Sequence, residues 1–80
     1  MPRLLLIDDD EHLAAPLAAY LKRFDLTLES ALRPSVGLAR LREGGFDAVI
    51  LDVMLPEMDG FDVCRAIRRD PALAGLPILM

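Results

Sequence analysis

The chain has 80 residues, of which 54% are hydrophobic, and its 13 acidic and nine basic side chains give a net charge of −4. This length allows one domain, the acidic balance argues against a nucleic-acid surface, and a single cysteine excludes an internal disulfide. No apolar run approaches the roughly 18 residues of a membrane span, and no secretory signal is present, so we expect a cytoplasmic protein without a membrane partner.

The first half of the chain predicts two strands and a helix. Residues 4–7 are a short continuous apolar run, which is typical of a buried strand. Residues 11–24 predict a helix, because Leu13, Leu17, Leu21 and Phe24 recur at helical spacing along one face. Pro16 cannot donate to a helical hydrogen bond, so we expect a kink there or a helix whose regular part starts later. Residues 26–31 begin with the alternation of an edge strand.

The second half continues the alternation of strands and helices. Pro34 opens a second helix, which Gly44 and Gly45 end, and its predicted apolar side consists of Val36, Gly37, Leu38 and Leu41. Residues 48–51 form another continuous apolar strand, and a loop follows over residues 53–60. A third helix is predicted with Phe61, Cys64 and Ile67 on its inner side, and a fourth strand begins within residues 75–80. The order βαβαβαβ predicts an α/β fold with a parallel sheet and helices on both faces.

Aspartates follow both continuous apolar strands at the points where these end. Asp8 and Asp9 come after residues 4–7, and Asp52 comes after residues 48–51. Ligands of open parallel sheets bind outside the carboxyl ends of the strands, and neighbouring strands lie about 4.8 Å apart. If these two strands are neighbours, the three carboxylates converge and repel one another. A divalent cation would relieve the repulsion, and Mg²⁺ suits oxygen ligands of this kind best.

The strings "LLLIDDDE" and "VILDVMLPEMDGFDVCRAIR", at their spacing in this chain, resemble those of a bacterial response-regulator receiver domain. The resemblance covers all 80 residues. It implies a doubly wound, flavodoxin-like parallel sheet with strand order 2-1-3-4-5 when complete. The chain would then be one receiver domain, residues 1–80, truncated after the start of its fourth strand. Its open fourth strand would favour association with a second copy of the chain.

The resemblance also implies a role for each acidic residue. Asp52 resembles the phosphoacceptor, Asp9 a direct Mg²⁺ ligand, and Asp8 the acid that holds a metal-bound water. Asp52 and the backbone carbonyl of Met54 would complete the metal site. The implied function is a signalling switch and not an enzyme, phosphorylated by a sensor histidine kinase. Transcription would be regulated through a DNA-binding winged-helix output domain outside this chain.

Other parts of the site are implied less completely. Pro56 and Gly60 would shape the loop around the acceptor. The family's switch threonine or serine and its lysine would lie beyond Met80. Asp10 is expected only to cap the helix predicted from residue 11.

Two alternatives compete with this interpretation. A phosphatase of the haloacid-dehalogenase class also uses two aspartates two residues apart, as Asp8 and Asp10 are. However, this chain has His12 where such a phosphatase has a small residue, and the interpretation leaves Asp52 unexplained. The other alternative is a pseudo-receiver, an interaction module that is never phosphorylated. The presence of all three acids argues against it.

Overall fold

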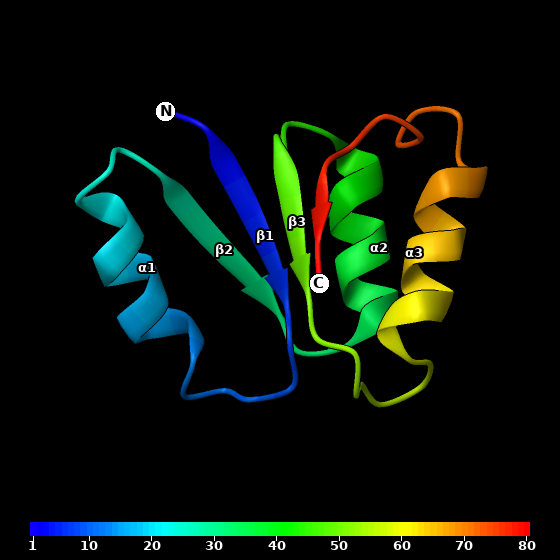
Figure 1. Cartoon of the computed structure of the whole chain (residues 1–80), viewed down its shortest axis with the longest axis horizontal. Helices are drawn as coiled ribbons and strands as arrows, with labels where there is room; N and C mark the ends of the chain where they lie inside the picture. Colours follow the sequence, from blue (N-terminus) through cyan, green and yellow to red (C-terminus); the bar gives the residue numbers. More distant parts are fainter.

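The computed structural model describes all residues from 1 to 80 and contains four strands and three helices (Figure 1). The elements in chain order are β1 (Arg3–Ile7), α1 (Ala14–Lys22), β2 (Thr27–Ala31), α2 (Pro34–Glu43), β3 (Ala48–Leu51), α3 (Gly60–Arg69) and β4 (Ile78–Leu79). All three strand pairings are parallel, and the sheet order is β2-β1-β3-β4. The predicted α/β fold is therefore confirmed. No helix has the length and apolar character needed to cross a membrane.

The order of the strands places helices on both faces of the sheet. The chain steps from β1 outward to β2 and then returns across β1 to β3. Right-handed crossovers in opposite directions put α1 on one face and α2 on the other. The main core lies on the α2 and α3 face and consists of Leu5, Ile7, Ala31, Leu38, Leu41, Val49, Leu51, Val63, Ile67 and Leu73. Leu6 is only 2% exposed but lies outside this cluster, because its side chain points to the α1 face.

The first helix begins later than residue 11, as Pro16 predicted. Residues 11–13 form a turn, and α1 starts at Ala14, so Pro16 is the third helical residue. Helical positions this early lack an intrahelical acceptor, so the missing N–H of proline costs little. The apolar face of this helix is only partly covered: α1 has no buried residue, Leu17 and Leu21 are half-buried, and Phe24 is 58% exposed. α1 packs chiefly on the edge strand β2, which leaves much of the helix uncovered.

The faces of α2 and α3 agree with the prediction only in part, and in α3 the predicted Cys64 is half-buried. α2 buries Pro34, Gly37, Leu38 and Leu41, but Val36 is 48% exposed. α3 buries Gly60, Val63 and Ile67, whereas Phe61 is 53% exposed. Because Gly60 packs against the backbone at the end of β3, the next residue is rotated by about 100° toward solvent.

A small ionic network ties the N-terminal end of the sheet to α2. The Arg3 guanidinium donates to Glu29 Oε2 from Nε at 3.0 Å and from an NH2 group at 2.6 Å. Arg40 of α2 pairs with the other carboxylate oxygen of Glu29. Arg3 also lies over the Phe46 ring, 4.5 Å from its centroid. The hydrogen bond from Arg3, with further contributions from Arg40, lowers the pKa of Glu29 below its ordinary value.

This network predicts an acid-sensitive contribution to folding. The pKa of Glu29 is lower in the folded chain than in the unfolded one, so its contribution is present above the unfolded pKa and is lost as pH falls through the folded pKa. The free energy of unfolding, measured with urea, should therefore fall less between neutral and acidic pH for Glu29→Gln than for the wild type. Glu43→Gln, outside every ion pair, is the control. Parallel pH profiles for Glu29→Gln and the wild type would contradict the assignment.

Candidate functional site

The pairing of β1 with β3 fixes the backbone on which the site is built. Ile7 lies opposite Leu51 in the parallel register, so Asp8 and Asp52 follow on neighbouring strands. The Asp52 N–H donates to the Ile7 carbonyl at 3.0 Å, and the Asp8 N–H donates to the Ala31 carbonyl of β2 at 3.1 Å. Both aspartates are thus anchored by backbone hydrogen bonds that continue the sheet.

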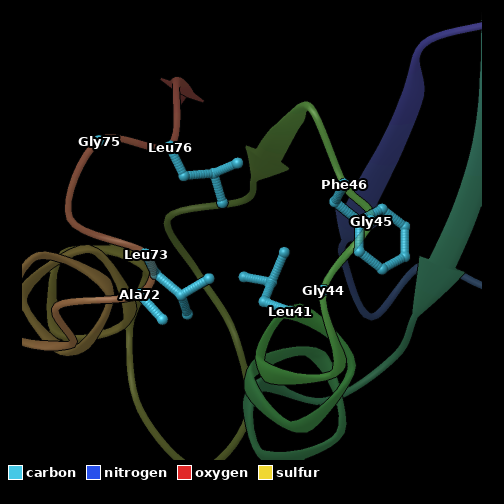
Figure 2. A pocket seen from close by; sticks show the side chains of 8 residues that line it. All are labelled: Leu41, Gly44, Gly45, Phe46, Ala72, Leu73, Gly75 and Leu76. Carbon is cyan, nitrogen blue, oxygen red and sulfur yellow. The ribbon is translucent and has the colours of Figure 1, made fainter.

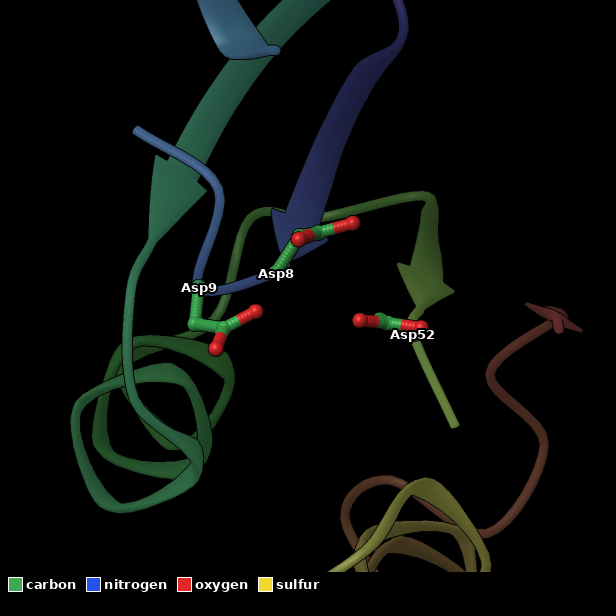
Figure 3. A group of neighbouring side chains, drawn as sticks. All are labelled: Asp8, Asp9 and Asp52. Carbon is green, nitrogen blue, oxygen red and sulfur yellow. The ribbon is translucent and has the colours of Figure 1, made fainter. Parts of the chain in front are cut away.

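The three predicted acids converge at the carboxyl ends of β1 and β3. One carboxylate oxygen each of Asp8, Asp9 and Asp52 lies within 4.8 Å of the others. Figure 3 shows the carboxylates of Asp9 and Asp52 turned toward one another across the gap between the strand ends. Asp8 and Asp52 are half-buried and Asp9 is exposed. No arginine, lysine or histidine forms an ion pair with any of them, so their negative charge is not neutralised within the chain.

An open hollow of about 750 Å³ adjoins this acid cluster. Its lining comes from the end of β1 and from the segment after β3, and consists of Asp9, Asp52, Val53, Met54, Leu55, Pro56 and Asp59. The Met54 side chain is 81% exposed and contributes little to the packing. The Met54 N–H approaches Asp52 Oδ1 at 3.4 Å, which is a long and weak hydrogen bond. The site is therefore open to solvent, and an anionic ligand could enter it if a cation bound to the acids at the same time.

Asp10, by contrast, lies outside the acid cluster. Its Oδ1 accepts from the His12 N–H at 2.9 Å, while the Asp10 N–H donates to Asp8 Oδ1 at 2.9 Å. Asp10 therefore caps the turn before α1, close to its predicted role. Its carboxylate caps the chain's own backbone, which agrees with a structural role better than with that of the second acid in the phosphatase interpretation.

The segment between β3 and α3 is held by its close contact with the end of β3. The Gly60 N–H donates to the Val53 carbonyl at 2.8 Å, and a Cβ atom at residue 60 would collide with the carbonyl oxygen of Asp52. Asp59 caps α3 by accepting from the Asp62 N–H, and Asp62 accepts from the Asp59 N–H in return. The sequence interpretation missed this capping box, although an N-cap aspartate with an acid three residues later is close to its usual signature.

A second hollow lies at the opposite end of α2 from the acid cluster. It has a volume of about 220 Å³ and is lined by Leu41, Gly44, Gly45, Phe46, Ala72, Leu73, Gly75 and Leu76 (Figure 2). None of these side chains is ionisable or forms hydrogen bonds. This pocket therefore offers no group for catalysis or metal binding, and the chemistry of the chain is concentrated at the acid cluster.

Comparison with known proteins places these features in a family. The profile described as "Response regulator receiver domain" matches residues 4–80. The transcriptional regulatory protein AfsQ1 of Streptomyces coelicolor is 45% identical over 80 residues, which are 100% of this chain and 34% of AfsQ1. The chain thus spans about a third of the length of the curated relatives it matches.

Solved structures agree with this match. The chemotaxis response regulator CheY4 of Vibrio cholerae superposes with a TM-score of 0.92 at 30% identity, over 100% of this chain and 67% of that chain. A chain in the complex of histidine kinase ThkA with response regulator TrrA gives 0.88 at 27% identity, over 98% and 66%. TrrA of Thermotoga maritima in complex with Mg²⁺-BeF gives 0.80 at 29% identity, over 86% and 60%.

The close approach at Gly60 generates a stability prediction. Gly60→Ala should lower the free energy of unfolding by about 1–3 kcal/mol, because backbone atoms cannot move aside for the new methyl group. Gly75→Ala is the matched control, since no atom lies within 4 Å of its added Cβ, and it should stay within about 0.5 kcal/mol of wild type. Chemical denaturation measures both. Equal stabilities for the two variants would show that the contact at Gly60 is not tight.

Proposed function

The chain belongs to the response regulator receiver family, and from that premise we propose that it is a phosphoacceptor switch of a two-component system, with Asp52 as the acceptor. The observation that carries the proposal is the convergence of Asp8, Asp9 and Asp52 where β1 and β3 end. The strand order reverses between these two strands, which is where open α/β sheets bind their ligands.

Asp52 is favoured over Asp8 as the nucleophile because its carboxylate is less engaged. Asp8 Oδ1 accepts a hydrogen bond of ordinary length from the Asp10 N–H at 2.9 Å. Asp52 receives only the 3.4 Å contact from the Met54 N–H and lines the open hollow. Its lone pairs can therefore reach a phosphorus atom that enters from solvent. A positioned carboxylate of this kind is a known nucleophile in phosphoryl transfer.

The same cluster would hold Mg²⁺. We assign Asp9, Asp52 and the Met54 backbone carbonyl as direct ligands, and Asp8 as the holder of a metal-bound water. Three carboxylates without a cationic partner form an all-oxygen donor set, which matches the preference of this ion. The Mg²⁺-BeF complex of the similar protein TrrA supports the choice. When bound, the ion would neutralise charge on the acids and on the incoming phosphoryl group.

The phosphoryl donor would be the phosphohistidine of a sensor kinase. An Asp52 carboxylate oxygen attacks phosphorus, the phosphorus–nitrogen bond breaks, and its electron pair returns to the imidazole, which can then take up a proton. The product is an acyl phosphate on Asp52. The backbone hydrogen bond from Asp52 to Ile7 holds the attacking group in place during transfer. The kinase–regulator complex that contains TrrA supports this class of partner.

The wider function would lie outside these 80 residues. AfsQ1 is a transcriptional regulatory protein and is longer than this chain. We propose that the protein regulates transcription in the cytoplasm through a DNA-binding segment beyond the receiver, as a continuation of the same polypeptide. The exposed Leu79 on edge strand β4 would favour contact with a second copy when the strand is uncovered.

Phosphorylation of Asp52 is tested by intact mass of the full-length protein after incubation with Mg²⁺ and acetyl phosphate. The wild type and Asp10→Asn should gain one phosphoryl group, and Asp52→Asn should gain none, because an amide is a poor nucleophile. Asp10 is the matched control, since it lies in the same region but caps a turn. A phosphoryl group that persists in Asp52→Asn, or turnover of small phosphate esters, would contradict the proposal.

The role of Asp9 is tested by Mg²⁺ titration calorimetry. Asp9→Asn removes one charge from the cluster and should weaken Mg²⁺ binding at least about tenfold, whereas Asp10→Asn should leave the affinity near that of the wild type. Equal affinities for Asp9→Asn and the wild type would remove Asp9 from the metal site.

A further inference from the structure

Glu57 lies in the segment between β3 and α3 in an unusual backbone conformation. Its φ is +66°, in the left-handed region that residues with a Cβ atom adopt at a cost. Glycine would occupy this position without strain. Such strain persists only where surrounding contacts compensate for it, so the contacts of Glu57 indicate why this residue stands here.

The Glu57 carboxylate is bound to the first turn of α2. Oε1 accepts from the Ser35 N–H at 3.0 Å, and Oε2 accepts from the Ser35 hydroxyl at 3.0 Å. Arg33, the N-cap residue of α2, supplies no side-chain cap of its own. Glu57 therefore satisfies an N–H of this helix from a distant part of the chain. The backbone hydrogen bond from Ser35, followed by that from its hydroxyl, lowers the pKa of Glu57.

The two ends of this contact lie in different parts of the fold. α2 is anchored in the core through its buried Pro34, Leu38 and Leu41, and Gly37 packs on the Ile7 side chain of β1. The other end is the segment of residues 53–58, of which residues 53–56 line the hollow beside Asp9 and Asp52. Within that segment, Glu57 is the only side chain that hydrogen-bonds to another helix or strand. The contact thus joins a helix anchored in the core to the segment that forms one wall of the site.

We propose that Glu57 is a positioning residue for phosphorylation: its double hydrogen bond to Ser35 holds the segment that carries Met54 in the place where its backbone can meet the cation. The inference rests on the proposed function, because it concerns the same site. Glu57 does not touch the reacting atoms and acts through the segment it holds. Loss of the contact should therefore weaken Mg²⁺ binding and slow phosphoryl transfer while Asp52 itself remains intact.

Two substitutions separate this role from a purely structural one. Glu57→Ala removes the contact and keeps a Cβ atom in the left-handed conformation, whereas Glu57→Gly removes the contact and also the strain. If Glu57 acts by positioning, both variants lose function, although Glu57→Gly has the higher Tm. Glu57→Gln keeps an acceptor oxygen and should recover part of the activity. Glu43→Ala, in the last turn of α2 and outside all ion pairs, is the control.

The test uses the full-length protein, with Mg²⁺ affinity from calorimetry and the rate of phosphorylation by acetyl phosphate from intact mass. We expect Glu57→Ala and Glu57→Gly each to bind Mg²⁺ about tenfold more weakly than the wild type. Their phosphorylation rates should fall by about the same factor. Glu57→Gln should fall between these variants and the wild type. Ser35→Ala, which keeps the N–H donor, should lose less than Glu57→Ala.

Two results would overturn the inference. One is wild-type Mg²⁺ affinity and rate in both Glu57→Ala and Glu57→Gly. The other is a loss confined to Glu57→Ala, which would assign the effect to backbone strain. If the wild type itself takes no phosphate, the proposed function fails, and the Mg²⁺ affinities alone still decide whether Glu57 positions the cation site.

Discussion

Parallel hydrogen bonding between β1 and β3 is the constraint on which the site depends. Leu5 and Ile7 of β1 face the same core as Val49 and Leu51 of β3, so the buried side chains admit only the observed register. A slip of one residue would move every apolar side chain to the wrong face. The register that fills the core is the same one that brings Asp8 and Asp9 beside Asp52. Core packing therefore holds together acids that repel one another.

This arrangement has a thermodynamic consequence. Three carboxylates within 4.8 Å and without a cationic side chain oppose folding in the absence of a ligand. A cation that binds only the folded chain would relieve this repulsion and stabilise the fold. On the proposed function, the hydrophobic core would stabilise an acid cluster that is available to bind a cation and, with it, a phosphoryl group. Asp9 is the most exposed of the three acids, so water screens its charge more than that of the other two.

The fold was largely predictable because its signals are local. Continuous apolar runs marked β1 and β3, Pro34 and Gly44 marked the ends of α2, and Pro16 predicted the late start of α1. The faces of the helices were less predictable, since they depend on contacts between distant segments. The approach of Gly60 to the end of β3 rotates Phe61 outward, and no local pattern reveals that approach.

The candidate site divides in the same way. The convergence of Asp8, Asp9 and Asp52 followed from their position after two buried strands, given that these strands are neighbours. The contact of Glu57 with Ser35 joins residues 22 positions apart, and nothing in the sequence near Glu57 indicates its partner. The capping box of Asp59 and Asp62 was readable from their spacing. The acids of the candidate site can thus be predicted from their positions after the strands. A supporting residue such as Glu57 is found only from its tertiary contacts in the structure.

The central claim is that Asp52 receives the phosphoryl group beside a cation held by Asp9, and one structure tests it most directly. The measurement is a crystal structure of the full-length protein grown with Mg²⁺ and beryllofluoride, a mimic of the phosphoryl group. The account predicts beryllofluoride on an Asp52 carboxylate oxygen, with Mg²⁺ bound by Asp9, Asp52 and the Met54 carbonyl and with Asp8 reaching it through water. Beryllofluoride on Asp8, or Mg²⁺ bound without Asp9 and Asp52, would contradict the account.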